Sequence, residues 1–301
     1  MKIAITGGTG FIGRHLAHDL VQRGHEIVLI ARGLYTRGDQ GRPDHNLTFV
    51  RADVTDTAAL IKAFGGCTAV VHCAGSSTED GSQTFQQVHV EGAHSAVAAA
   101  QEASVKKFVL VSYLHARSDN HSAYLRTKWE GEEIVRRSGL NYTILKAGLV
   151  YGSGDHLLNN LGHLLRRLPV FATVGLRERT VRLVAVEDLV SVIRAALTDD
   201  RLSNQTLAVV GPEEFPFSSA ARRIAKAMGK PFLLVLPFPV FAQRLLAWVS
   251  ARMPKPLISA SQVQMLADGI SKPLPDSQML PADLAPSTRF TAEQIRKGLP
   301  T

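Results

Sequence analysis

Cysteine and long apolar runs are scarce in this sequence of 301 residues. The first scarcity argues against a disulfide framework and the second against a membrane-spanning helix. Two cysteines, Cys67 and Cys73, are too few for a disulfide framework and have no metal-ligand pattern around them. We therefore expect free thiols and no metal site. No apolar run reaches the length of about 18 residues that a membrane-spanning helix needs. We also expect no signal peptide, because Lys2 leads into a glycine-rich turn rather than an apolar stretch.

Acidic residues are outnumbered by basic ones, 26 against 34, which gives a net charge of +8 and a pI near 9.7. Such a balance suits anionic partners, for example a phosphorylated cofactor, nucleic acid or an acidic membrane surface. The basic residues are dispersed in short pairs such as Lys106-Lys107, however, and no nucleic-acid motif accompanies them. We predict a solvated basic surface and no nucleic-acid partner. An apolar content of 45% is sufficient for a core.

The first thirteen residues contain the most specific pattern. A short apolar strand runs into Gly7-Gly8-Thr9-Gly10-Phe11-Ile12-Gly13 and then into a helical stretch. Gly7 permits a tight turn, Gly10 leaves room for a pyrophosphate at the backbone, and Gly13 lets the helix pack closely. The helix N-terminus would direct unpaired N–H groups at that phosphate. The pattern predicts a dinucleotide site; a glycine-rich turn without a ligand is the alternative.

The first half of the chain alternates apolar strands with helical patterns. This alternation predicts an α/β fold, a Rossmann-like doubly wound parallel sheet with helices on both faces. We expect strands at 2–6, 26–31, 47–51, 69–73, 107–112 and 142–146, and helices at 11–23, 56–64, 84–103 and 123–137.

After residue 152 the pattern becomes more helical. We expect an NAD(P)-binding domain over 1–152, with 181–211 returning to the same sheet, and a smaller, mostly helical substrate or lid region over 153–180 and 212–301. Ser218 and Thr291 are predicted as helix caps. Expected helices lie at 157–168, 187–197, 217–228, 237–253, 259–269 and 291–297, and expected strands at 181–186 and 207–210.

Cofactor preference depends on the end of the second strand. A carboxylate there would bind the 2′-hydroxyl of the adenosine ribose, but the chain has Ala31 and Arg32 instead. Arg32 would pair with a 2′-phosphate, and Arg14 and Arg37 could assist. The sequence therefore favours NADP(H) over NAD(H); a solvated loop charge at Arg32 is the alternative.

Two further strand ends carry candidate cofactor contacts. Asp53-Val54 follows the third strand, where Asp53 either accepts from the adenine amino group or starts the next helix. Cys73-Ala74-Gly75 ends the fourth strand, and its small residues would let a cofactor lie against the backbone. His72, just before them, is predicted to pack at the strand end rather than to act as a catalyst.

A tyrosine and a lysine lie four residues apart in Tyr124-Leu125-Arg126-Thr127-Lys128. Positions i and i+4 share a helix face, so the Lys128 ammonium would lie near the Tyr124 phenol. Free tyrosine has a pKa of ~10, and a nearby cation would favour the phenolate that acid–base chemistry at neutral pH requires. Ser112, at the end of the preceding strand, could donate to a substrate carbonyl.

Together these motifs resemble the short-chain dehydrogenase/reductase superfamily, in the extended and atypical branch that includes sugar-nucleotide epimerases and dehydratases. The resemblance covers residues 1–212, including the stretches 145–152 and 184–189. The stretch 127–133 is most similar to the group related to the NADPH-binding accessory subunit of respiratory complex I. The resemblance implies that Tyr124 is the acid–base residue, that Lys128 binds the nicotinamide ribose and lowers the tyrosine pKa, and that Ser112 polarises the substrate.

Three positions depart from the family's pattern. Ala147 stands where proline is usual, His89 stands where many members have asparagine, and Tyr113-Leu114 follows Ser112 in place of a small residue. Members of the complex I branch can also hold a nucleotide without known turnover, so binding and catalysis are separate questions.

The sequence predicts an NADP(H)-dependent oxidoreductase acting on a small carbonyl or alcohol substrate. Two alternatives stay open: an epimerase or dehydratase that retains its cofactor, and a non-catalytic NADPH-bound structural or sensor subunit of a membrane assembly. The apolar stretch Pro237–Met253 is a lid or core helix, or else it lies on a membrane surface or partner. The expected location is cytoplasmic. If the apolar stretch contacts a membrane, we expect a peripheral location on the inner face of that membrane. A homo-oligomer also stays open.

Overall fold

A computed structural model of the chain describes residues 1–33, 45–79, 83–167, 170–174, 178–230, 232–238 and 273–299. The chain divides into two compact units. Unit 1 contains Met1–Lys146, Val190–Ala208 and Leu274–Leu284, and unit 2 contains Ala147–Leu189, Val209–Pro273 and Ala285–Thr301.

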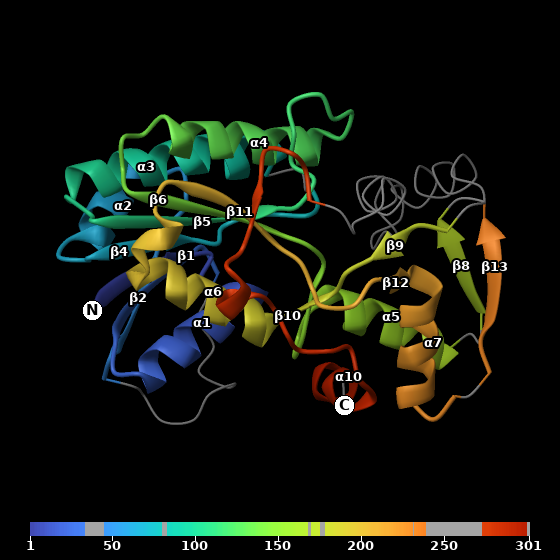
Figure 1. The fold of residues 1–301 in the computed structure, drawn as a ribbon. Helices are drawn as coiled ribbons and strands as arrows, with labels where there is room; N and C mark the ends of the chain where they lie inside the picture. The colour runs from blue at the N-terminus through green and yellow to red at the C-terminus, as the bar shows by residue number, and fades with distance from the viewer. Residues whose placement is uncertain are drawn as a thin grey trace. The chain divides into compact units, whose positions relative to one another are not determined.

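An eight-stranded sheet forms the centre of unit 1, in the order β14-β11-β6-β5-β4-β1-β2-β3 (Figure 1). β1 pairs in parallel with β2 and β4, β2 with β3, and β4 with β5. The strand order reverses between β1 and β4, and ligands of such sheets bind beside the carboxyl ends at that point. The strands are β1 (Lys2–Thr6), β2 (Glu26–Ala31), β3 (Leu47–Arg51), β4 (Ala69–His72), β5 (Lys107–Tyr113), β6 (Tyr142–Ala147), β11 (Gln205–Val209) and β14 (Gln278–Met279).

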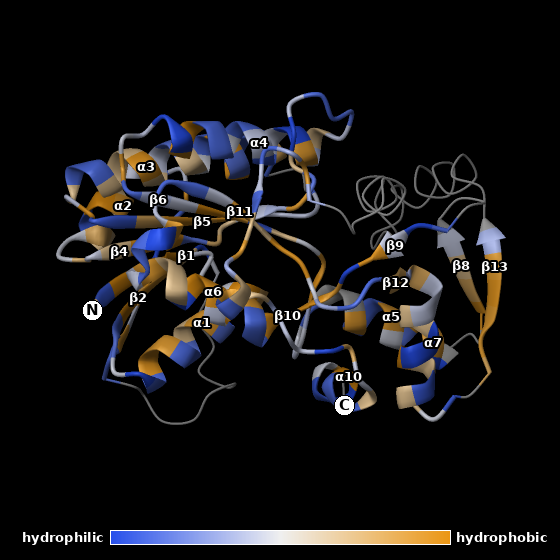
Figure 2. Cartoon of the chain, in the orientation of Figure 1, coloured by the Kyte–Doolittle hydropathy of each residue, from blue (hydrophilic) through white to orange (hydrophobic). Residues whose placement is uncertain are grey.

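Helices cover both faces of this sheet, which confirms the predicted Rossmann-like fold. In Figure 1, α3 and α4 lie above the sheet, while α1 and α6 lie below it. Figure 2 shows hydrophobic colour along the central strands and mixed colours along the helices, as expected for a sheet buried on both faces. The helices are α1 (Phe11–Gln22), α2 (Thr57–Phe64), the π-helix η2 (Gln86–Glu91), α3 (Gly92–Glu102), α4 (Ala123–Arg136), α6 (Val186–Thr198), and the short 3₁₀ helices η3 (Asp200–Leu202) and η4 (Ala282–Leu284).

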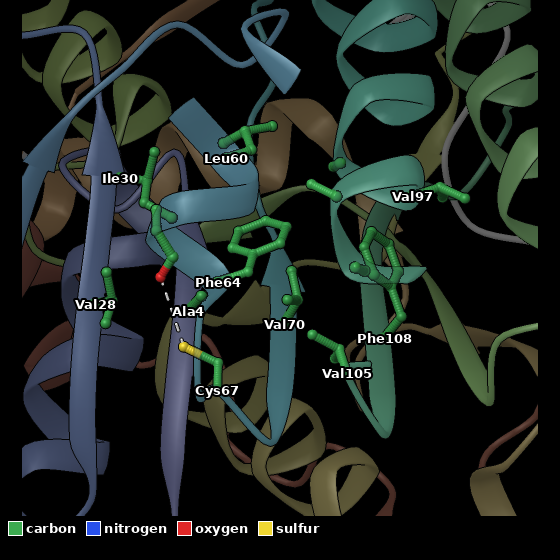
Figure 3. Close-up of a cluster of buried hydrophobic side chains, with 14 of the residues drawn as sticks. Ala4, Val28, Ile30, Leu60, Phe64, Cys67, Val70, Val97, Val105 and Phe108 are labelled. Atoms are coloured by element: carbon green, nitrogen blue, oxygen red, sulfur yellow. Dashed lines mark hydrogen bonds between the residues drawn. The ribbon is translucent and has the colours of Figure 1, made fainter. Parts of the chain in front are cut away.

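The core between the sheet and helices α2, α3 and α4 is apolar. Figure 3 shows the rings of Phe64 and Phe108 among aliphatic side chains from both layers, and neither ring is exposed to solvent. The Cys67 thiol is buried there, 3.7 Å from the carbonyl oxygen of Ala63, and burial raises its pKa. Both cysteines are free, as expected.

Unit 2 contains more strand structure than the sequence predicted. The helices expected at 157–168, 217–228 and 291–297 are present as α5 (His156–Arg167), α7 (Phe217–Ala227) and α10 (Ala292–Gly298). Three two-stranded pairs accompany them: β7 (Val150–Tyr151) with β10 (Val184–Ala185), β9 (Thr180–Val181) with β12 (Phe215–Pro216), and β8 (Val170–Val174) with β13 (Leu234–Phe238). Short apolar runs do not distinguish strand from helix by period, which explains the miss.

The observed helix caps agree with the sequence prediction at one position and differ from it at another. Asp56 caps α2 by accepting from the N–H of Ala59. Thr291 caps α10, as predicted. Ser218, in contrast, lies inside α7. Its backbone N–H and its hydroxyl both donate to Glu178, so a carboxylate from a distant part of the sequence satisfies this helix end.

The expectations for the last third of the chain can be compared with the structure only in part. Pro237 and Phe238 belong to β13 rather than to the helix expected at 237–253. Residues 239–253 and the helix expected at 259–269 lie outside the described residues. Leu274–Leu284, which the sequence placed in the smaller region, belongs to unit 1 because β14 pairs with β11. In the described part of the chain, no helix combines the length and apolar character needed to cross a bilayer.

Candidate nucleotide-binding and active site

The glycine-rich turn brings the end of β1 against the end of β4. Gly7 has a φ of +67°, and a Cβ there would lie 2.8 Å from the backbone of Ala74. A Cβ on Gly13 would lie 2.4 Å from the carbonyl oxygen of Gly7. A side chain at Gly7 would therefore push the turn away from the end of β4, and one at Gly13 would push the turn away from α1. The glycine-rich turn, the start of α1 and the end of β4, which the sequence assigned to one cofactor site, are therefore in contact.

The start of α1 is open to an anion. Gly10 is the N-cap residue, no side chain caps it, and Gly10 itself is exposed. The first N–H groups of a helix have no partner within the helix, and its dipole favours negative charge there. The glycine-rich turn has no room for side chains at Gly7 and Gly13, and it leads into a helix N-terminus without a side-chain cap. This arrangement fits a dinucleotide pyrophosphate.

Arg32 and Asp53 lie together beyond the ends of β2 and β3. The Nε atom of Arg32 is 3.9 Å from Oδ2 of Asp53, and its Nη2 donates to Oε1 of Gln83 at 2.5 Å. Oδ1 of Asp53 accepts from the backbone N–H and the hydroxyl of Thr55, so one oxygen stabilises the turn before α2. Val54 packs beside Gly92 of α3. Arg37 lies outside the described residues.

His72 is a packed strand-end residue, as predicted. It is 1% exposed, its Nδ1 lies 2.9 Å from the hydroxyl of Thr6, and its ring stacks on Phe108. Burial lowers the pKa of His72 to about 3, with the positive charge of Lys128 acting in the same direction. The imidazole is therefore neutral at physiological pH.

Lys128 reaches the end of β4 from α4. A Cβ on Gly75 would lie 2.9 Å from its Nζ, which places the ammonium beside the exposed backbone of Gly75. The lysine keeps partial access to solvent at its surface, yet its burial lowers the pKa to about 8, against the opposing influence of Cys73 and Glu132. Lys128 thus remains mostly protonated at pH 7 and is poised to contact a group lying on Gly75.

The phenol of Tyr124 is more deeply buried than the sequence suggested. Its ring makes edge contacts with Phe85, His89 and Tyr113 at centroid distances of 5.3 to 5.8 Å. Burial raises the pKa of Tyr124 above its usual range. Desolvation is the dominant effect on the phenol in this structure, and a lowering of its pKa by Lys128 stays a prediction.

Ser112 is directed elsewhere than the sequence suggested. Its hydroxyl donates to Oε1 of Glu132 at 2.5 Å, so its proton is already engaged. Glu132 is fully buried and also binds Arg136 at 2.7 Å and Lys146 at 3.3 Å. Lys146 in turn donates to Asp276 at 2.7 Å. In this structure the hydroxyl of Ser112 thus donates to a buried carboxylate, and its donation to a substrate carbonyl stays a prediction.

Sequence reasoning missed this charge network as a unit. A helical ladder at i, i+4 and i+8, namely Lys128, Glu132 and Arg136, was visible in the sequence as a signal. Nothing in the sequence indicated that Lys146 would be buried or that Asp276 would be its partner, because 130 residues separate them.

His89 connects two segments of the site. Its Nε2 accepts from the backbone N–H of Ser76 at 3.3 Å, and its Nδ1 lies 2.9 Å from the hydroxyl of Thr127. Burial lowers the pKa of His89 to about 2, with the charge of Lys128 adding to it. The neutral ring connects the loop after β4 to the helix that carries Tyr124 and Lys128.

These features define a class of protein. A parallel sheet with its order reversed beside a glycine turn and an open helix N-terminus is a dinucleotide-binding fold. Comparison with known proteins agrees, since a family model described as NAD(P)H-binding matches residues 7–156.

Individual relatives place the chain more closely. It is 32% identical over 241 residues to the ceramide reductase of Caulobacter vibrioides, an alignment that covers 79% of this chain and 74% of the relative. It is 23% identical over 312 residues to the mitochondrial NADH-ubiquinone oxidoreductase 40 kDa subunit of Neurospora crassa, covering 98% and 79%. The solved structure of MoeE5 with UDP-glucuronic acid and NAD shares the fold, with a TM-score of 0.73 and 17% identity over 99% of this chain and 97% of that one.

The chain belongs to the short-chain dehydrogenase/reductase superfamily, in the extended branch that includes relatives of the complex I accessory subunit. It is an NAD(P)-binding protein of that type.

Proposed function

We propose that the protein is an NADP(H)-dependent reductase of a small carbonyl substrate. The observation that carries the proposal is the position of Lys128, whose ammonium lies beside Gly75 on the helix that also presents Tyr124. The nicotinamide supplies the hydride when it is bound. The name of the Caulobacter relative, a ceramide reductase, supports reduction as the chemistry.

The protonation states of the two residues fit reduction in particular. Burial keeps Tyr124 as a neutral phenol, which can donate a proton to the oxygen of a carbonyl as negative charge develops there. Lys128, with its pKa lowered to about 8, carries a positive charge at pH 7 that stabilises the phenolate left behind. Tyr124 thus acts as the proton donor, and Lys128 supplies the positive charge that stabilises its phenolate.

The preference for a phosphorylated cofactor is supported by Arg32. Its guanidinium lies beyond the carboxyl end of β2, half exposed, and its contact with Asp53 is long at 3.9 Å. A 2′-phosphate could replace Gln83 as the partner of Nη2, because a charge-assisted bond to phosphate is stronger than one to a neutral amide.

Calorimetry with NADPH and NADH tests the cofactor part of this proposal. We expect saturable binding of both nucleotides by the wild-type protein, with NADPH bound more tightly. The variant Arg32→Ala should weaken NADPH binding by about 10- to 100-fold, the value of one charge-assisted contact, and leave NADH within about threefold. Arg23→Ala, which removes an exposed arginine at the other end of α1, serves as the control. Equal losses for the two nucleotides would show that Arg32 does not read the phosphate.

A second prediction concerns Ser112. Because its proton is engaged by Glu132, Ser112→Ala should reduce turnover by less than about tenfold, far below the loss expected for a direct donor to the reacting oxygen. The same change removes one partner of a buried carboxylate and should lower the free energy of unfolding by about 1–3 kcal/mol. Steady-state kinetics and urea unfolding measure the two effects. A loss of turnover above a hundredfold would restore the substrate-polarising role.

A second candidate function is a protein that holds NADPH without turning it over, docked in a larger assembly. The engaged hydroxyl of Ser112 favours it, because the site then offers the substrate one donor fewer. Mass spectrometry of the natively purified protein distinguishes the two. A reductase should exchange its nucleotide freely, whereas a structural subunit should retain it through purification and show no turnover with any carbonyl in a broad panel.

A further inference from the structure

The ribbon formed by β8 and β13 in unit 2 is apolar on both faces. The strands are parallel, with Leu234 opposite Val170 and Leu236 opposite Ala172. On one face, Phe171 joins the core of the unit and Val235 packs against it. A ribbon with one face on a core ordinarily alternates apolar and polar residues. Here the opposite face is apolar as well.

That outward face is open to solvent. Leu234 and Leu236 are 44% and 45% exposed, and Phe232, which precedes them with the same alternation, is 71% exposed. Ala172 of β8 is also exposed. Single exposed apolar residues are common on proteins, but a contiguous row marks a contact surface.

The two stretches of sequence that contain α5 with β8 and α7 with β13 carry charge of one sign. Residues 156–177 and 215–267 contain no aspartate or glutamate and ten lysines and arginines. The rest of the chain is near balance, with 24 basic and 26 acidic residues, so these two segments account for the whole positive excess.

Positive charge also lies at a defined end of the ribbon. The ammonium of Lys230 donates to the carbonyl oxygens of Leu165 and Arg166, at 2.9 and 2.6 Å. This contact joins the end of α5 to the segment after α7, just before the two parallel strands begin. The exposed residue Arg166 and Lys230 therefore stand where both strands start.

We propose that the outward face of the β8–β13 ribbon, formed by Phe232, Leu234, Leu236, Val170 and Ala172, docks on an anionic phospholipid bilayer. Apolar side chains that enter the interface and basic residues that attract acidic headgroups are the two parts of a peripheral membrane site. A second copy of the chain is a poorer occupant, because two surfaces that each carry basic residues beside the apolar row repel each other.

Sedimentation with vesicles tests the proposal on the full chain. The wild-type protein should bind vesicles of phosphatidylcholine mixed with phosphatidylglycerol, bind vesicles of phosphatidylcholine alone much more weakly, and lose affinity as salt rises. The double variant Leu234→Ser/Leu236→Ser should bind the anionic vesicles about tenfold more weakly, because it removes two half-exposed leucines from the contact. NADPH binding should be unchanged in that variant, which separates this proposal from the proposed function.

Met279→Ser is the matched control, since Met279 is an exposed apolar residue of unit 1 at 58% exposure. It should bind vesicles as the wild type does. Absence of wild-type binding to anionic vesicles, equal binding to neutral ones, or an equal loss in Met279→Ser would each overturn the proposal. So would a self-association, seen by sedimentation velocity, that the double variant abolishes, because it would identify a second copy as the occupant.

Discussion

Replacing Tyr124 with phenylalanine is expected to reduce carbonyl reduction by about 100- to 10,000-fold while NADPH affinity changes little. The phenol lies on the helix that carries Lys128, and its raised pKa keeps its proton in place at neutral pH. Phenylalanine keeps the ring contacts with Phe85 and His89, so the fold should persist. NADPH oxidation with an active carbonyl, and calorimetry with NADPH, give the two readouts.

Tyr142→Phe provides the control, because it also removes a phenol but lies on β6 at the edge of the apolar core. It should retain wild-type turnover. If Tyr124→Phe retained turnover within about threefold, the proton would have to come from another group, and the reductase mechanism proposed for Tyr124 would be wrong.

The contrast between Tyr124 and the glycine turn shows what the sequence could predict. The turn is a local object: its backbone conformation and the close approach at Gly7 follow from adjacent residues, and the strands around it were predicted to within a residue or two. The i, i+4 spacing correctly placed Lys128 and Tyr124 on one helix. It could not say that desolvation would outweigh a nearby cation, because burial depends on rings contributed by Phe85 and Tyr113 from other segments.

Ser112 illustrates the same limit for hydrogen bonding. The sequence placed it at a strand end beside the helix of Tyr124, and the structure agrees. The direction of its hydroxyl depends on Glu132, which also binds Arg136 and Lys146. Competition among long-range partners decides such a network, and no local pattern encodes it.

The stability of the protein should fall steeply as the pH drops from about 6.5 to 5. His72 and His89 are held neutral by burial, with pKa values lowered to about 3 and about 2 from an ordinary value of 6.5. In this range the two histidines bind protons in the unfolded chain but stay neutral in the folded protein, so the free energy of unfolding decreases as the pH falls. Each histidine should contribute a slope that rises toward about 1.4 kcal/mol per pH unit, or roughly 3 kcal/mol for the pair between pH 6.5 and 5.

Urea unfolding at several pH values measures this slope, and single variants assign it. His72→Asn and His89→Asn should each remove about half of the slope, whatever they do to stability at pH 7, because asparagine cannot take up the proton in the unfolded state. His94→Asn, at an exposed position of α3, should leave the slope unchanged. Glu132, whose pKa burial raises, acts in the opposite direction, but its contribution is common to all variants and cancels in the comparison. A slope that survives both substitutions would mean that the two imidazoles accept protons in the folded state, and that the loop after β4 opens readily enough to admit water to them.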